Sequence, residues 1–583
     1  MIIGLNLAHD ASAAITDSSG VVISALAEER ISRKKNHIGV PRKSLEKLLA
    51  EVEIKQIEKL VIGGQDLIAR SNAEKLMMDL RNNPSNPEGT WKTPHPGATS
   101  KLKQDKRAPK KIIEDLLVEL LPRNLRDIPI EWENHHDSHL GCALGNVVEK
   151  TSILLSLDGE GDGESGAVAL TRNGKINSLS RIPQLDSLGN LYSAVTSRYN
   201  FTPGKHEGKI TGLAAFGSYS KAVDVLIEHV KIKNGIPEIL FAKDFKSRLT
   251  SRVVSRLGLS LKSFRTLEQI VDLAEVNTEN YSDLAFAVQM VLEKSVTEIV
   301  DYWVKQTGVS DISLAGGVFA NVKLNQRISE LGCVNDVKVF PNMGDGGIAL
   351  GGIWANLSRE NKISKAPLYG SMYLAPENEL FEELDSARND AQLVIDNFDD
   401  SVLFNRIAED IAMSKMVAIH NGSMEFGPRA LGNRSLLLDP RRAEILKTAN
   451  ERLKRTEFMP FAPIVLKDHF LNYFNISSTQ SIQPFEYMAM TCDVNLALAG
   501  KIPAVVHIDN TARPQVVTES SNMYTHKILV AFFELTGIPL LVNTSLNVHE
   551  EPINYVLQDS IKALKSGAID VIYNGNHKIE LIK

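Results

Sequence analysis

Short apolar runs separated by polar loops, a pattern typical of β-strands, recur at two places in the chain. The first set lies at residues 2–6, 13–16 and 21–27, with a polar loop carrying His9 and Asp10 after its first run. The second set lies at residues 153–157, 166–171 and 176–182, with a polar loop that begins at Asp158. Turn glycines Gly20 and Gly174 occupy matching places. This repetition predicts two duplicated α/β lobes that face one another across a cleft.

A long amphipathic segment and two glycine-rich turns follow the second set. Ser282 could cap a helix whose apolar residues recur at helical spacing from 284 to 303. Glycine turns lie at 314–321 and 341–347, and the second opens a helix of small residues at 348–355. The stretch 356–367 is polar and lacks strong periodicity. We therefore expect a two-lobed domain at residues 1–360 and a second α/β unit at residues 361–583.

A polar, basic insertion is predicted near residues 81–111, where the chain holds four prolines before Pro109. Its run of Lys and Arg at 101–107 could touch a phosphate-bearing partner, or it could be a solvated surface loop. No function is assigned to it.

Composition narrows the class of protein. The 583 residues are 43% hydrophobic and 23% charged, which describes a folded, soluble chain. No apolar run approaches the roughly 20 residues that span a bilayer, so we expect no membrane partner. Three widely spaced cysteines predict a reducing, cytoplasmic home. The net charge of -6 argues against nucleic acid as a partner.

His135 and His139 are the first candidates for chemistry. On a helix they share one face, one turn apart, which is the spacing that a common metal ion needs. Asp158 and Asp345, each next to a predicted strand end or helix start, could complete the site. Two imidazoles and one or two carboxylates suit iron(II), manganese or zinc. The same residues could have roles that need no metal. Residues around the histidines could cap a surface helix, and Asp158 could accept hydrogen bonds from the amides of a turn.

The glycine turns could bind a nucleotide. Backbone N–H groups of Gly316, Gly317 and the turn at 344–347 could receive phosphate or ribose oxygens, although tight turns without a ligand are common. Lys205, His206 and Lys209 add positive charge beside another glycine-rich bend.

The second unit carries arginines suited to oxyanions. Arg429 and Arg434 lie five residues apart around a proline and glycine turn, and Lys454, Arg455 and Arg513 follow. The segment 543–547 adds small hydrogen-bonding side chains after a buried strand. Each arginine alone could form a surface ion pair. Together they indicate a pocket for a polyphosphate or a carboxy-phosphate.

An ordered set of motifs makes the chain recognisable. The motifs are 9–14, 27–30 with 33–35, 135–139, 157–159, Gly316-Gly317, Phe426–Ser435, 460–463, 517–520, 543–545 and 551–552. With them the chain resembles, over nearly its full length, the O-carbamoyltransferases, the family of nodulation-factor, cephalosporin, tobramycin and ansamycin carbamoyltransferases.

The resemblance implies a fold and a reaction. The N-terminal part would form actin-like lobes of the sugar-kinase type, similar to the tRNA threonylcarbamoyl transferases, and the C-terminal part a YrdC-like α/β domain. The C-terminal domain would use ATP, with Mg²⁺, to convert carbamoyl phosphate into carbamoyl adenylate and pyrophosphate. The N-terminal domain would then pass the carbamoyl group to a hydroxyl of a small molecule, as in natural-product or antibiotic biosynthesis.

The resemblance also implies roles for residues. Iron(II), or another divalent metal, would be bound by His135, His139, Asp158 and Asp345. The adenylate would be held by Lys209, Gly316, Gly317 and Asn321. Carbamoyl phosphate and ATP would be held by Arg429, Lys454, Arg513, Asn543 and Ser545. Some relatives have arginine where this chain has Met459, and Arg455 could substitute.

Two further residues belong to the transfer chemistry that the resemblance implies. His9 lies where the family has its proposed general base, and an imidazole with a pKa near neutral could take the acceptor's proton. It could instead hydrogen-bond loop amides. Lys35 could add positive charge in the same cleft, or be a solvated lysine.

Two other functions remain open at this stage. One is a tRNA threonylcarbamoylation enzyme, against which the acidic net charge and the order of the motifs argue. The other is an actin-like protein that binds a nucleotide without transferring a group. The acceptor and the oligomeric state are not determined, and a homodimer is among the states that the sequence allows.

Overall fold

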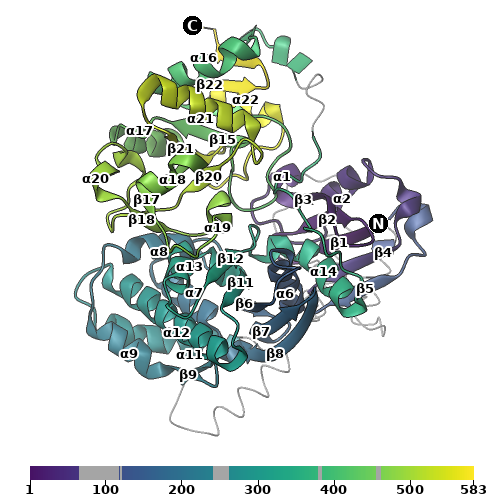
Figure 1. Ribbon diagram of the computed structural model, residues 1–583, viewed down its shortest axis with the longest axis vertical. Helices are drawn as coiled ribbons and strands as arrows, with labels where there is room; N and C mark the ends of the chain where they lie inside the picture. The colour runs from purple at the N-terminus through teal and green to yellow at the C-terminus, as the bar shows by residue number, and fades with distance from the viewer. Residues whose placement is uncertain are drawn as a thin grey trace, which may run out of the picture.

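The protein is described here by a computed structural model, in which three parts surround a common centre (Figure 1). The structure describes residues 1–64, 121–240, 261–377, 387–454 and 461–582, and the single positions 114, 117, 118, 384 and 385. The basic insertion predicted near 81–111, together with Arg455 and Met459, lies outside these residues. We call the parts lobe 1 (residues 1–64 and 121–133), lobe 2 (residues 150–340) and the C-terminal unit (residues 393–582).

Lobe 1 is built on a five-stranded sheet in the order β3-β2-β1-β4-β5. Its first three strands form an antiparallel meander, and the last two add to it in parallel. The strands are β1 (Ile2–Asn6), β2 (Ser12–Thr16), β3 (Val22–Ala27), β4 (Lys59–Gly63) and β5 (Ile130–Glu133). Short helices α1 (Glu28–Ser32) and α2 (Arg42–Leu49) follow β3.

Lobe 2 repeats this topology. Its sheet has the order β12-β11-β6-β7-β8, again an antiparallel meander extended by two parallel strands. The strands are β6 (Ser152–Gly161), β7 (Glu164–Arg172), β8 (Lys175–Pro183), β11 (Asp311–Ala315) and β12 (Asp336–Val339). The predicted duplication is therefore confirmed.

Helices and a small hairpin complete lobe 2. The helices are α7 (Leu188–Arg198), α8 (Glu207–Ala214), α9 (Lys221–His229), α11 (Leu261–Glu275), α12 (Asp283–Thr307) and α13 (Val322–Ser329), and the hairpin joins β9 (Val230–Lys233) to β10 (Ile236–Ile239). Ser282 precedes α12, as predicted, but its side chain does not cap the helix. Its hydroxyl donates to the carbonyl oxygen of Phe216 instead, so the capping prediction was wrong.

Two helices join the lobes. Helix α6 (His135–Gly145) packs on the sheet of lobe 2, and α14 (Ile348–Glu360) packs on the sheet of lobe 1, so the two cross face to face. Glycines make this approach possible, because a Cβ on Gly141 would lie 2.0 Å from the carbonyl oxygen of Gly351. The close crossing brings the N-terminal ends of both helices to the same place.

The C-terminal unit contains an eight-stranded mixed sheet in the order β13-β23-β22-β14-β15-β21-β16-β20. Its strands are β13 (Leu393–Asn397), β14 (Val417–His420), β15 (Arg434–Leu438), β16 (Ala462–Leu466), β20 (Gln515–Val517), β21 (Leu540–Ser545), β22 (Val571–Asn574) and β23 (His577–Leu581). Its longer helices are α16 (Asp400–Ala412), α17 (Glu444–Arg452), α18 (Lys467–Tyr473), α21 (Met523–Thr536) and α22 (Leu557–Lys565). The division of the chain at residue 360 stays a prediction.

The remaining elements of this unit are short. A three-stranded sheet consists of β17 (Phe474–Asn475), β18 (Cys492–Val494) and β19 (Thr511–Ala512), and two single-turn helices are α19 (Gln483–Glu486) and α20 (Leu496–Ala499). Within the part of the chain that the structure describes, no helix is long and apolar enough to cross a membrane.

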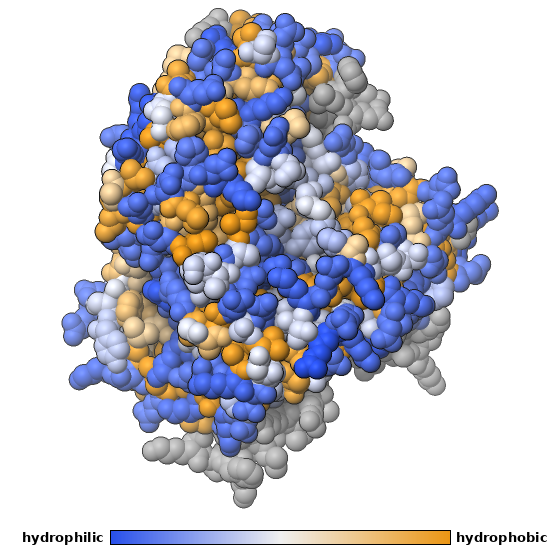
Figure 2. Space-filling view, viewed as in Figure 1, coloured by the Kyte–Doolittle hydropathy of each residue, from blue (hydrophilic) through white to orange (hydrophobic). Residues whose placement is uncertain are grey.

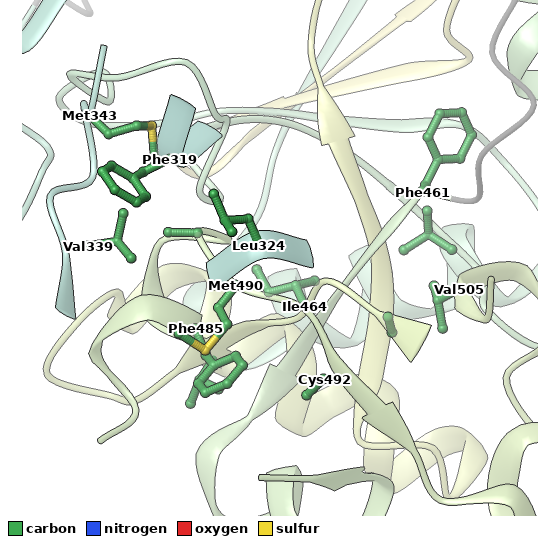
Figure 3. Packing of buried hydrophobic residues seen from close by; sticks show 14 of the residues in the cluster. Phe319, Leu324, Val339, Met343, Phe461, Ile464, Phe485, Met490, Cys492 and Val505 are labelled. Carbon is green, nitrogen blue, oxygen red and sulfur yellow. The ribbon is translucent and has the colours of Figure 1, made fainter. Parts of the chain in front are cut away.

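Lobe 2 and the C-terminal unit share one hydrophobic core. Phe319, Leu324 and Val339 of lobe 2 belong to the same buried cluster as Phe485 and Met490, and Figure 3 shows these side chains gathered together. Burial of apolar surface contributes roughly 25 cal/mol per Å², so this contact holds the two parts as one body.

Side-chain amides also seal the edge of the lobe 2 sheet. Gln480 exchanges two hydrogen bonds with the backbone of Val337, at 3.1 and 2.8 Å. Gln483 does the same with Val339, at 3.2 and 3.0 Å. The C-terminal unit thereby occupies the place of a further strand beside β12. In the view of Figure 2, hydrophilic and hydrophobic side chains intermingle across the outside of the molecule.

Candidate active site

The two predicted metal-binding histidines lie on one face of α6, as their spacing predicted. Asn134 caps this helix by accepting hydrogen bonds from the backbone N–H groups of His136 and Asp137. The Nε2 atoms of His135 and His139 lie 3.1 Å apart. Asp158 Oδ2 lies 3.0 Å from His139 Nε2, and Asp345 Oδ1 lies 3.4 Å from the same nitrogen. We call these four residues the His–Asp cluster.

The His–Asp cluster fits a divalent cation. Its four ligand atoms all lie within 4.8 Å of one another. Metal–ligand bonds of about 2.0–2.2 Å place neighbouring ligand atoms roughly 3.0–3.5 Å apart, close to the separations observed between His139 and both carboxylates. Two nitrogen and two oxygen donors, with both imidazoles buried, are a set that iron(II), manganese or zinc accepts.

Glycine residues leave room for the side chains of the His–Asp cluster. A Cβ on Gly161 would lie 2.2 Å from the ring of His135, and one on Gly317 would lie 2.8 Å from Asp158 Oδ1. Gly316, with φ of +105°, packs against the carbonyl oxygen of Leu157. Asp158 belongs to β6, which continues to Gly161 with a register shift, so the loop predicted to begin at Asp158 is an irregular strand end.

Burial, hydrogen bonds and charges within the cluster shift the pKa values of its members. Burial alone would raise the pKa of Asp158, but hydrogen bonds from His135 and His139 hold it well below its usual range. Burial raises the pKa of Asp345, and the charge of Asp158 adds to this. Burial alone would lower the pKa of His139, but hydrogen bonds to both carboxylates raise it. The arrangement therefore favours positive charge at its centre.

His9 is paired with a residue that sequence reasoning did not single out. Its Nδ1 lies 2.9 Å from Asp10 Oδ2, and Asn36 donates to the other oxygen of Asp10. Burial alone would lower the pKa of His9, but the hydrogen bond and charge of Asp10, with the charges of Asp345 and Asp158, raise it to about 9. This value lies above the near-neutral pKa considered from the sequence. The adjacency of Asp10 was the available signal.

A buried amide links the His9 loop to the cluster. Asn6, at the end of β1, donates to the backbone carbonyl oxygens of His9 at 2.7 Å and of Asp345 at 2.9 Å. Ser12 donates to the carbonyl oxygen of Gly346 at 2.8 Å. Both contacts connect lobe 1 to the turn that precedes α14, so His9 has a fixed position relative to the cluster.

A single cavity of about 1500 Å³ runs between the three parts. Many of the candidate residues line it, namely His9, Lys35, Asp158, Lys209, Gly317, Asn321, Asp345, Arg429, Arg513, Asn543 and Ser545. His135 and His139 do not line it, although their carboxylate partners do, and Gly316 and Lys454 are also absent from the lining.

The residues that were expected to hold the adenylate also contact other parts of the protein. The side chain of Asn321 caps α13 by accepting from Leu324 N, and it exchanges hydrogen bonds with Gln289 at 2.7 and 3.2 Å. Lys209 Nζ lies 5.2 Å from the centre of the Phe201 ring. The Asn321 amide is therefore largely committed to the protein. The same holds for Gln289, which no motif indicated and which also accepts from Tyr192 and donates to Glu293.

The basic end of the cavity belongs to the C-terminal unit. Arg429 and Arg513 line it from two loops, while Asn543 and Ser545 line it from β21. Ser545 Oγ donates to Asn547 Oδ1 at 2.5 Å. Lobe 1 reaches this end through Arg30, which donates to the carbonyl oxygen of Gly427 at 2.8 Å. The cavity thus connects the basic end to the His–Asp cluster.

The chain has relatives along its whole length. It is 29% identical over 583 residues to the nodulation protein NolNO of Sinorhizobium fredii, covering 98% of this chain and 79% of that protein. It is 30% identical over 445 residues to the nodulation protein NolO of Bradyrhizobium diazoefficiens, covering 76% of this chain and 78% of that protein. An uncharacterized protein of Methanocaldococcus jannaschii is 28% identical over 586 residues, all of both chains.

Solved structures match more weakly. Full-length HypF in its phosphate- and nucleotide-bound form matches with a TM-score of 0.33 and 13% identity, over 62% of this chain and 56% of that one. Component A of (R)-2-hydroxyglutaryl-CoA dehydratase from Acidaminococcus fermentans matches with a TM-score of 0.33 and 11% identity, over 61% of this chain and 98% of that one.

Family models account for most of the sequence. Residues 1–353 match the carbamoyltransferase N-terminus, and residues 408–580 match the carbamoyltransferase C-terminus. The chain belongs to this family and is a carbamoyltransferase.

Proposed function

We propose that the protein is an ATP-dependent O-carbamoyltransferase that works in two steps. In the first, carbamoyl phosphate, ATP and water give carbamoyl adenylate, pyrophosphate and phosphate at the basic end of the cavity. In the second, a hydroxyl of a small-molecule acceptor takes the carbamoyl group at the His–Asp cluster, and AMP leaves. The acceptor oxygen gains the carbonyl carbon, and its proton passes to a base.

The observation that carries this proposal is the continuous cavity. A mixed anhydride of carbamic acid and AMP is reactive towards water, so a direct path between the two steps limits its loss by hydrolysis. The cavity of about 1500 Å³ reaches from Arg429 and Arg513 to Asp158 and Asp345. One end of the cavity is cationic and suits phosphates, and the other carries carboxylates that suit a cation. No wall of protein separates the two ends within this cavity.

The transfer end has residues for each task. His135, His139, Asp158 and Asp345 would hold a divalent metal, which would supply Lewis acidity towards developing oxyanion charge. Lys209 and the Gly317 turn would hold the adenylate, and Lys35 would add positive charge. His9, oriented by Asp10, would receive the acceptor proton. The pKa of His9 is about 9 without a cation. A cation bound by Asp158 and Asp345 would offset their negative charge, which would lower the pKa of His9 and make it easier to deprotonate.

The activation end uses cations and small polar side chains. Arg429 and Arg513 suit bidentate contacts with phosphate oxygens, and Ser545 can donate a hydroxyl hydrogen bond. Mg²⁺ would accompany ATP. Lys454 lies outside the cavity lining, so we assign it no direct contact.

The test separates the two steps. Protein loaded with iron(II) receives carbon-labelled carbamoyl phosphate and ATP, and pyrophosphate and labelled acceptors are measured. His139→Ala is expected to keep pyrophosphate formation and lose label transfer, whereas Arg429→Ala is expected to lose both. His229→Ala, a change on α9 away from the cavity lining, is the control. Normal transfer by His139→Ala would contradict the assignment of the cluster, and absence of pyrophosphate in the unaltered protein would contradict the reaction.

A further inference from the structure

Asn543 lines the cavity and carries a buried polar atom that lacks a hydrogen-bond partner among the described residues. The side chain of Asn543 is only 2% exposed, and its carbonyl oxygen Oδ1 is without a partner among the described residues. Leaving a buried acceptor unsatisfied costs roughly 1–3 kcal/mol. Asn543 lies on β21 at the basic end of the cavity. Because Asn543 lines the cavity, a bound ligand is a candidate for the missing donor.

The orientation of the Asn543 amide is fixed by its neighbours. Its Nδ2 donates to the backbone carbonyl oxygen of Ala430 at 3.1 Å and to Gln515 Oε1 at 2.7 Å. Gln515 in turn donates from Nε2 to the backbone carbonyl oxygen of Leu431 at 2.7 Å. Because backbone carbonyls only accept, neither amide can be reversed. Both N–H groups of Asn543 are used, so only its carbonyl oxygen remains for a ligand.

This orientation changes the role expected for Asn543. A carbonyl oxygen cannot hydrogen-bond a phosphate oxygen, because both atoms accept. Ala430 and Leu431 directly follow Arg429, so the amide pair is anchored to the backbone beside the arginine suited to phosphate. The NH₂ group that carbamoyl phosphate carries beside its phosphate is a donor that suits this oxygen.

We propose that Asn543 Oδ1 accepts a hydrogen bond from the NH₂ group of the carbamoyl donor, and that Gln515 is the positioning residue that holds Asn543 in this orientation. The proposal rests on the proposed use of carbamoyl phosphate. Asn543 then determines donor specificity. Acetyl phosphate has almost the same shape but carries a methyl group in place of NH₂, so it would leave Asn543 Oδ1 unsatisfied.

The test compares two donors. Full-length protein with ATP and Mg²⁺ receives carbamoyl phosphate or acetyl phosphate, and kcat/KM for pyrophosphate release is measured for each. We expect the unaltered protein to prefer carbamoyl phosphate by roughly 100-fold or more. Asn543→Leu should reduce this preference roughly 10- to 100-fold, through loss of activity with carbamoyl phosphate and not with acetyl phosphate.

Two further variants keep the result interpretable. Gln515→Leu leaves Asn543 in place but removes its anchor, so the preference should fall by a smaller factor, even if Asn543→Leu fails to fold. Asn574→Leu removes a fully buried amide from β22 of the same sheet, outside the cavity lining, and should leave the preference unchanged.

The outcomes are distinct. If the unaltered protein releases no pyrophosphate with either donor, the proposed function is wrong. If it does, but Asn543→Leu and Gln515→Leu slow both donors equally or leave the ratio unchanged, then Asn543 has a structural role or its oxygen is satisfied by water, and the inference is overturned.

Discussion

The two ends of the cavity are built in different ways. At the His–Asp end, ligand atoms come from a helix, a strand and a turn opening a helix, and they lie within 4.8 Å of one another. At the basic end, Arg429 and Arg513 come from loops, and a buried acceptor on β21 has no partner within the described part of the chain. In the proposed reaction, the first end would need only a cation to be complete, whereas the second would need a larger ligand. Catalytic geometry can thus be preformed where a small ion binds and left open where a substrate completes it.

Breaking the preformed end should give the largest effect. A Cβ in Gly161→Ala would lie 2.2 Å from the ring of His135, so the ring must move. Displacement by about 1 Å can reduce a rate on the order of 100-fold, so transfer should fall by at least about that factor. Bound metal, measured by elemental analysis, should fall as well, while pyrophosphate release continues.

Gly332→Ala provides the matched control, because a Cβ there meets nothing within 4 Å. Loss of pyrophosphate release together with transfer in Gly161→Ala would show that the two ends do not act separately.

The pairing of His9 with Asp10 predicts an effect of intermediate size on pH dependence. The charge of Asp10 helps to raise the pKa of His9 to about 9, so Asp10→Asn should lower it. A base must be deprotonated, so the rise of the transfer rate with pH should move to lower pH, by about one to two units. Single-turnover transfer from preformed adenylate, measured across pH, checks this.

The same pairing affects stability with a defined sign. The folded-state pKa of His9 is raised above its ordinary 6.5, so the pair stabilises the fold fully below that value and loses this contribution as pH rises through about 9. Asp10→Asn should therefore lower the melting temperature more at pH 6 than at pH 10. An equal decrease at both pH values would contradict the pairing.

The ion pair between lobe 2 and the C-terminal unit should have the smallest effect. Lys323 Nζ lies 3.0 Å from Asp509 Oδ2. Burial alone would raise the pKa of Asp509, but hydrogen bonds from His507 and Thr511 and the charge of Lys323 lower it strongly. Lys323→Ala should reduce the free energy of unfolding by about 1 kcal/mol or less at pH 7. The depressed pKa means that this contribution is present above pH 4 and fades at lower pH.

Urea unfolding at pH 7 measures that loss, and Lys305→Ala, which breaks an exposed pair with Asp301, is the control. Loss of either synthetic step in Lys323→Ala would show that the joint positions the cavity rather than only stabilising it.

Local patterns predicted much of the fold. The two meanders, the spacing of His135 and His139 and the glycine turns are each determined by neighbours in sequence, because strand alternation and helical spacing are local. The cap at Ser282 failed because its hydroxyl bonds to Phe216, 66 residues away. The links from Asn6 to Asp345 and from Asn543 to Gln515 depend on tertiary packing, so no spacing in the sequence indicated them.

The hydrogen bonds of Gln480 and Gln483 along β12 affect what happens when the N-terminal part of the chain is expressed without the rest. An exposed strand edge invites pairing with another chain, and in this protein the two glutamines satisfy that edge from a distant part of the sequence. A fragment ending near residue 360 would uncover it together with the apolar side chains beside it. We expect such a fragment to self-associate, so separate expression of the two halves is a poor route to studying either reaction.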